Sequence, residues 1–102
     1  GQHPGLDVGD ACWAQLFRKT GLRGESALIT GDSNIENFKA FRDGHKVRSL
    51  VVGADAEVTL YEDPNFDDDA IVVRGPAVIG DLDDTRLDDE AESMTLRCVR
   101  RY

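Results

Sequence analysis

The stretch SMTLRCV at residues 93–99 alternates between two faces, as a strand with one buried side does. Met94, Leu96 and Cys98 fall on one face, and the intervening side chains fall on the other. The stretch SLVVGA at residues 49–54 has the same alternation of apolar side chains. Because the two stretches begin 44 residues apart (93 − 49), they point to a duplication of the chain.

Sliding the sequence on itself by 44 residues extends this match without a gap over most of the chain. The paired apolar residues include Leu16 with Leu60, Phe17 with Tyr61, Leu28 with Val72, and Ile35 with Ile79. Propellers and solenoids also repeat at such lengths, but they need three or more units to bury their faces. Two units therefore indicate one internally duplicated domain.

Short segments rich in branched and aromatic residues, separated by Gly, Asp, Asn or Pro, are typical of strands. Eight are predicted, at residues 12–17, 26–30, 33–38, 46–53, 56–61, 70–74, 77–81 and 92–99. A chain of 102 residues is long enough for one core and too short for two. We expect an all-β fold, a two-sheet Greek-key β-sandwich. Residues 1–11 would form a flexible tail before a single domain over 12–102, with Greek-key units at about 12–54 and 55–99.

The net charge of −8 argues against nucleic-acid binding, which relies on Lys and Arg neutralising phosphates. A basic protein or a cation is the expected partner instead. No run of apolar residues is long enough for a membrane span, and the opening GQHPGLDVGD does not resemble a secretory signal. Charge also differs between the units, with net +3 over residues 14–52 (7 − 4) and net −10 over residues 58–96 (2 − 12).

Catalysis needs a nucleophile or an acid–base pair held in a cleft, and the sequence offers few candidates. His3 lies in the N-terminal tail, and His45 has no evident catalytic companion. The carboxylate runs at residues 67–69, 81–84 and 88–90 show no paired spacing, which favours a solvated acidic surface. We therefore predict that the chain is not an enzyme.

The stretch YEDPNF at residues 61–66 places two aromatic residues five positions apart, and Asp68 follows two residues later. The first unit has Phe17 and Gly24 at equivalent positions but Leu22 for the second aromatic. This pattern resembles the βγ-crystallin superfamily, whose unit opens with an aromatic, four residues, an aromatic, one residue and Gly. Each unit thus departs from the family pattern at a different place.

The resemblance covers residues 12–99 and implies two calcium-binding loops of pattern N/D, N/D, any, any, S/T, S. The loops at residues 44–49 and 88–93 read GHKVRS and DDEAES. The ligand candidates that the resemblance implies are Asp88, Asp89, Glu92, Ser93 and Ser49. Both loops have lost part of the pattern, so we expect that no cofactor is required and that any calcium binding is weak.

Arg48 occupies a ligand-type position, where a guanidinium supplies no oxygen and repels a cation. In the family, each site draws side chains from both loops, which would place Arg48 near Asp89 and His45 near Glu92. We hypothesise that internal ion pairs replace the calcium ions. The alternative is that these are ordinary solvated loop charges, worth under about 1 kcal/mol per pair.

Cys12 and Cys98 lack the spacing of a zinc site. If a pseudo-twofold axis relates the units, these cysteines are equivalent to Ala56 and Ala54, which flank the covalent junction. Their Cα atoms should then lie about 6 to 7 Å apart, which predicts a disulfide rather than two buried thiols. A structural disulfide implies an oxidising compartment, so we expect a secreted or periplasmic protein.

Two functions of different class follow. The first is a non-enzymatic binding domain that recognises a basic protein partner as an inhibitor, immunity factor or toxin-like module. The resembling family includes a metalloproteinase inhibitor and killer toxins. The second is a calcium-binding or structural stability protein of the crystallin type. In either case we expect a monomer that binds neither nucleic acid nor membranes.

Overall fold

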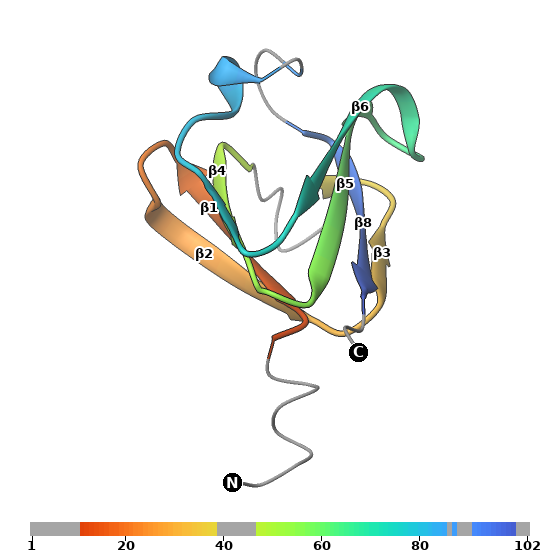
Figure 1. Ribbon diagram of the computed structural model, residues 1–102. Coiled ribbons are helices and arrows are strands. Elements are labelled where there is room, and N and C mark those ends of the chain that lie inside the picture. Colours follow the sequence, from red (N-terminus) through yellow and green to blue (C-terminus); the bar gives the residue numbers. More distant parts are fainter. Residues whose placement is uncertain (1–10, 39–46, 86, 88–90, 100–102) are drawn as a thin grey trace, which may run out of the picture.

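The protein is described by a computed structural model that covers residues 11–38, 47–85, 87 and 91–99 (Figure 1). These residues form two antiparallel four-stranded sheets. In strand order, the first sheet contains β2 (Arg23–Thr30), β1 (Trp13–Lys19), β4 (Ser49–Val52) and β7 (Ala77–Ile79). The second contains β3 (Ser33–Ile35), β8 (Ser93–Cys98), β5 (Ala56–Asp63) and β6 (Asp67–Arg74). The predicted two-sheet β-sandwich is confirmed.

The third strand of each unit pairs with the sheet of the other unit. Strand β3 lies beside β8, with Ile35 opposite Met94, and β7 lies beside β4, with Ile79 opposite Leu50. Each sheet therefore takes three strands from one unit and one from the other. The two units cannot separate without breaking backbone hydrogen bonds in both sheets.

The 44-residue repeat holds for individual backbone hydrogen bonds. The amide of Gly21 donates to the carbonyl of Gly80 at 2.7 Å, and the equivalent amide of Asn65 donates to Glu36 at 2.7 Å. Both bonds join one unit to the other, so loops as well as exchanged strands connect the two units. The duplication seen in the sequence is thus a pseudo-twofold symmetry of the fold.

The core lies between the sheets and contains the apolar members of each alternating strand. Leu16, Leu50, Leu60 and Met94 occupy equivalent positions in the two units, and all are fully buried. Burying a side chain of this size contributes about 1.5 to 3 kcal/mol. Cys98 shares a predicted face with Met94 but is exposed, because β8 ends at this residue.

The strand boundaries differ from the predicted ones in a symmetric way. Strands β2 and β6 begin at Arg23 and Asp67, three residues earlier than expected, because the polar start of each still pairs with the preceding strand. Strands β3 and β7 end earlier than expected, because the chain then turns toward the other unit. There the amide of Phe38 donates to Glu92 at 2.9 Å. The equivalent turn in the second unit leads into a short 3-10 helix, η2 (Leu82–Asp84). No helix in the described residues is long and apolar enough to cross a membrane.

Candidate functional site

Cys12 and Cys98 form a disulfide with a Cα–Cα distance of 5.4 Å, which confirms the predicted pair. The distance is shorter than the expected 6 to 7 Å. That expectation used the spacing of residues i and i+2 in one extended chain. Cys12 instead lies in the bend before β1 of the first sheet and Cys98 ends β8 of the second sheet, within ordinary disulfide range. Cys12 is 2% exposed, so the bond is attached to the core.

Asp32 fixes the end of β8 next to this disulfide. Its Oδ1 atom accepts a hydrogen bond from the amide of Cys98 at 2.8 Å. The next amide, that of Val99, donates to the carbonyl of Asp55 at 2.8 Å. The end of β8 is therefore held by a covalent bond and two hydrogen bonds in addition to its pairing with β5. A disulfide in a structural position is typical of proteins in oxidising compartments.

Ser49 and Ser93 are fully buried. Each forms what we call a serine clasp, in which one hydroxyl makes two hydrogen bonds to the backbone of the hairpin in its own unit. The Oγ atom of Ser93 accepts from the amide of Phe66 at 3.0 Å and donates to the carbonyl of Asp63 at 2.6 Å. The Oγ atom of Ser49 accepts from the amide of Leu22 at 3.0 Å and makes the equivalent donation. The hydroxyls at these two candidate ligand positions thus already serve the backbone.

The residues whose amides donate to the two serines lie in the left-handed backbone region. Leu22 and Phe66 both have φ of 58°, a conformation that costs a residue with a side chain roughly 1 to 2 kcal/mol. The two serine hydrogen bonds hold each residue in it. The ring of Phe66 packs edge-on against Tyr61, with 5.6 Å between centroids. The two spaced aromatics of the sequence pattern therefore pack against each other at the turn of the second hairpin.

The two candidate calcium loops meet at their centres. Val47 and Ala91, equivalent in the repeat, form an isolated antiparallel bridge and are both buried. Arg48 and Glu92 follow them, and the amide of each donates to its neighbouring strand at 2.9 Å. Arg48 is exposed and Glu92 is half-buried. The equivalent backbone positions of the two loops thus carry opposite charges.

His45, Asp88 and Asp89 lie outside the described residues. The pairing of Arg48 with Asp89 and of His45 with Glu92 therefore stays a prediction. Within residues 11–38, 47–85, 87 and 91–99, no three His, Cys, Asp or Glu residues are grouped to hold a metal ion. The described loop side chains offer a guanidinium and one carboxylate, whereas calcium takes six to eight oxygens. The described loop side chains alone therefore do not make up a calcium site.

The hairpins β1–β2 and β5–β6 carry opposite charges. The first holds Arg18, Lys19 and Arg23, and the second holds Glu62, Asp63, Asp67 and Asp69. Figure 1 shows these hairpins on opposite sides of the molecule. Arg18 pairs within its own hairpin, with its Nε 3.1 Å from Glu25. The charge asymmetry of the sequence therefore makes the molecule electrically polar.

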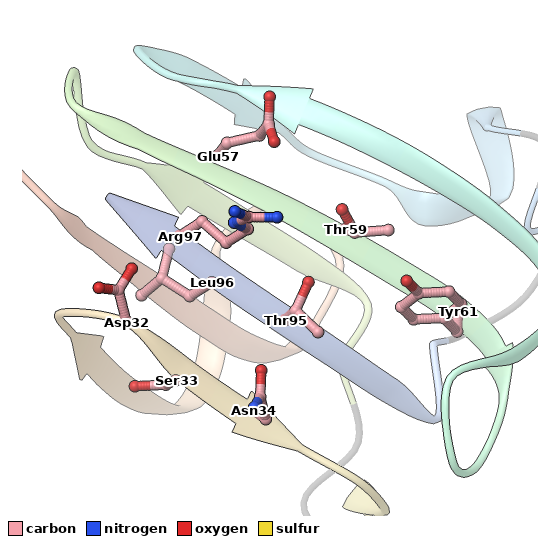
Figure 2. A pocket seen from close by; sticks show the side chains of 9 residues that line it. All are labelled: Asp32, Ser33, Asn34, Glu57, Thr59, Tyr61, Thr95, Leu96 and Arg97. Atoms are coloured by element: carbon pink, nitrogen blue, oxygen red, sulfur yellow. The ribbon is translucent and has the colours of Figure 1, made fainter. Parts of the chain in front are cut away.

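A shallow groove of about 590 Å³ crosses the outer face of the second sheet. Figure 2 shows the side chains that line it, which come from β3 and the residue before it, β8 and β5. Its polar residues include Asp32, Ser33, Asn34, Glu57, Thr59, Thr95 and Arg97. Tyr61 lies at one end of the row from β5. The sequence does not predict this groove, because its residues occupy the polar face of ordinary alternating strands.

No protein-family model and no curated protein matches the chain. Solved structures do match it. One, from a study titled "Evolution of the eye lens beta-gamma-crystallin domain fold", has a TM-score of 0.77 at 20% identity, covering 98% of this chain and 94% of that one. Spherulin 3a of Physarum polycephalum has a TM-score of 0.71 at 19% identity, covering 90% and 88%.

A βγ-crystallin domain of the Abundant Perithecial Protein of Neurospora crassa, in its Ca²⁺-bound form, has a TM-score of 0.70. It is 12% identical to this chain, and the match covers 90% of this chain and 94% of that one. The two equivalent Greek-key units and these structural matches together define the fold class. The chain has the βγ-crystallin fold.

Proposed function

We propose that the chain is a non-enzymatic recognition domain of an oxidising compartment, either secreted or periplasmic, that binds a basic protein partner. The observation that carries the proposal is the acidic hairpin β5–β6, which a disulfide-closed scaffold holds in a fixed shape. The proposal covers an inhibitor, an immunity factor or a toxin-like module, which all act by binding without chemistry.

The position of the acidic residues supports this proposal. Asp67 and Asp69 are exposed on β6, while the equivalent start of β2 carries Arg23. Like charges gathered on one side of a protein attract a cationic partner over about a Debye length and raise the association rate. Because a rigid hairpin presents them, a partner gains this attraction without ordering a loop.

A lysine decapeptide carrying a fluorophore tests the surface. Binding to the intact protein should weaken steeply as salt rises from about 20 to 200 mM, since screening removes the attraction. The D67N/D69N variant should bind at least threefold more weakly at low salt. The control E25Q/D55N removes two acidic charges elsewhere and should bind within about twofold of the intact protein.

Equal weakening in the two variants would mean that only net charge matters, and it would overturn the proposed surface. Sedimentation at low salt gives a second readout, because the basic hairpin of another copy could also reach the acidic hairpin. A dimer that D67N/D69N dissociates would identify a second copy as the occupant and contradict a foreign partner.

A structural calcium-binding role is the second candidate, favoured by the Ca²⁺-bound domain of the same fold. Under this proposal, the second loop would bind calcium weakly through Asp88, Asp89, Glu92 and Ser93. Calorimetric titration tests it. One weak equivalent would support a remnant site, heat at the level of the buffer blank would rule it out, and two micromolar equivalents would show two intact sites.

A further inference from the structure

The outer faces of the two sheets differ in a way that the fold does not require. Positions 34, 57 and 95 carry Asn34, Glu57 and Thr95 on the second sheet. Their equivalents on the first sheet are Val78, Trp13 and Val51 (34 + 44, 57 − 44 and 95 − 44). Since the same fold accepts apolar residues at these positions, its stability does not explain the polar set on the second sheet.

Arg97 and Gly53 show the same divergence most clearly. A Cβ atom on Gly53 would lie 2.7 Å from Nε1 of Trp13, so the indole covers this position on the first sheet. On the second sheet no ring covers the equivalent position, and Arg97 stands opposite Glu57. The groove is thus open where the first sheet is filled.

The strand register arranges the groove side chains in rows. Asn34, Thr95 and Thr59 lie opposite one another across β3, β8 and β5. Two residues further along, Arg97 and Glu57 form the next row. From Glu57 to Tyr61 the groove extends for four residues of strand, about 13 Å at roughly 3.3 Å per residue.

Hydrogen-bonding groups in this groove are left for a ligand. Within the described residues, the side chains of Asn34, Thr59, Thr95 and Arg97 make no hydrogen bond to the protein. On the first sheet, by contrast, Gln15, the equivalent of Thr59, donates its amide to Ser26 at 3.1 Å. The second sheet therefore presents unused donors and acceptors.

Two carboxylates in the groove are held in place by one oxygen each. Oδ1 of Asp32 accepts from the amide of Cys98 at 2.8 Å, and Oε2 of Glu57 accepts from Nε of Arg74 at 2.7 Å. The second oxygen of each can accept from a ligand. Because the backbone and the ion pair fix their orientation, these acceptors are preorganised.

We propose that this groove binds a saccharide. A sugar hydroxyl both donates and accepts, so it needs carboxylate acceptors next to amide and guanidinium donors, which is the alternation found here. The charges of Asp32, Glu57, Arg97 and Arg74 cancel, which disfavours an ionic ligand. Tyr61 adds an aromatic surface at the end of the row. This site is separate from the acidic hairpin and goes beyond the proposed protein recognition.

The test uses the intact oxidised protein labelled with ¹⁵N, titrated with cellohexaose, chitohexaose and xylohexaose to about 10 mM each. At least one of these probes should shift the amide signals of Asn34, Thr59, Thr95 and Arg97 with a dissociation constant of about 1 mM or tighter. The amides of the first sheet should stay unchanged.

Two matched variants each replace residues on the outer face of one sheet with the residue types at the equivalent positions of the other sheet. N34V/T95V introduces the residue type that the first sheet carries at both equivalent positions, so it should fold and should bind at least tenfold more weakly. The control V51T/V78N makes the reverse change on the first sheet and should keep the affinity within about twofold. Equal affinity in both variants, shifts confined to the first sheet, or no shift with any of the three probes would overturn the proposal.

Discussion

Cys12 and Cys98 join the two ends of the domain at the position where the pseudo-twofold axis places a counterpart of the covalent junction. Their equivalents, Ala56 and Ala54, are joined only by the chain between them. In register, Ala56 lies directly opposite Cys98 in the second sheet. The disulfide therefore gives the fold a second covalent link between its units and makes the closure nearly symmetric.

Removal of the disulfide is expected to cost about 4 kcal/mol, because a sequence separation of 86 closes a long loop in the unfolded chain. The C12A/C98A variant is the clean test, since alanine is what the other unit carries at both equivalent positions. Urea unfolding measures the loss, and the intact protein in reductant should lose a similar amount. A loss below about 1 kcal/mol would contradict the proposed role.

The serine clasps should contribute equally. Both S49A and S93A leave a partly buried amide and carbonyl without their partner, so each should lose about 1 to 3 kcal/mol of unfolding free energy. The control S26A removes an exposed hydroxyl and should change stability by no more than about 0.5 kcal/mol. If S49A and S93A unfold at the same urea concentration as S26A, the clasps do not stabilise the hairpins.

Two glycines provide a matched test of backbone strain. A Cβ atom at Gly31 or Gly80 would contact nothing within 4 Å, but only Gly31 has a left-handed φ, of 71°. G31A should therefore lose about 1 kcal/mol, whereas G80A should be neutral or slightly stabilising. Thermal unfolding of both variants measures the difference. Similar values would show that the turn at Gly31 relaxes without cost.

The alternation and the repeat predicted most of the fold. Met94 and Leu96 are buried as the pattern of residues 93–99 requires, and the 44-residue offset located the disulfide. The exchange of β3 and β7 could not be predicted in the same way. Each is a three-residue strand ending in isoleucine, so either would fit beside β4 or β8, and only the path of the chain decides between them.

The sequence predicted less of the candidate sites than of the fold. Ser49 and Ser93 were identified as possible ligands, but a hydroxyl that clasps a hairpin and one that binds a metal look the same in a pattern. The groove was missed because Thr59 and Thr95 resemble any solvated strand residues. The signal that could have found it was the repeat itself, by comparing outward positions such as Arg97 with Gly53.

We predict that the disulfide, and not calcium, stabilises this βγ-crystallin fold. The most direct test is the free energy of unfolding of the oxidised and the reduced protein, each in chelator and in about 1 mM calcium. We predict a loss of about 4 kcal/mol on reduction and a gain of at most about 0.4 kcal/mol from calcium, the limit for a dissociation constant of about 1 mM or weaker. A gain of more than about 2 kcal/mol from calcium in the oxidised protein, with little loss on reduction, would contradict the claim.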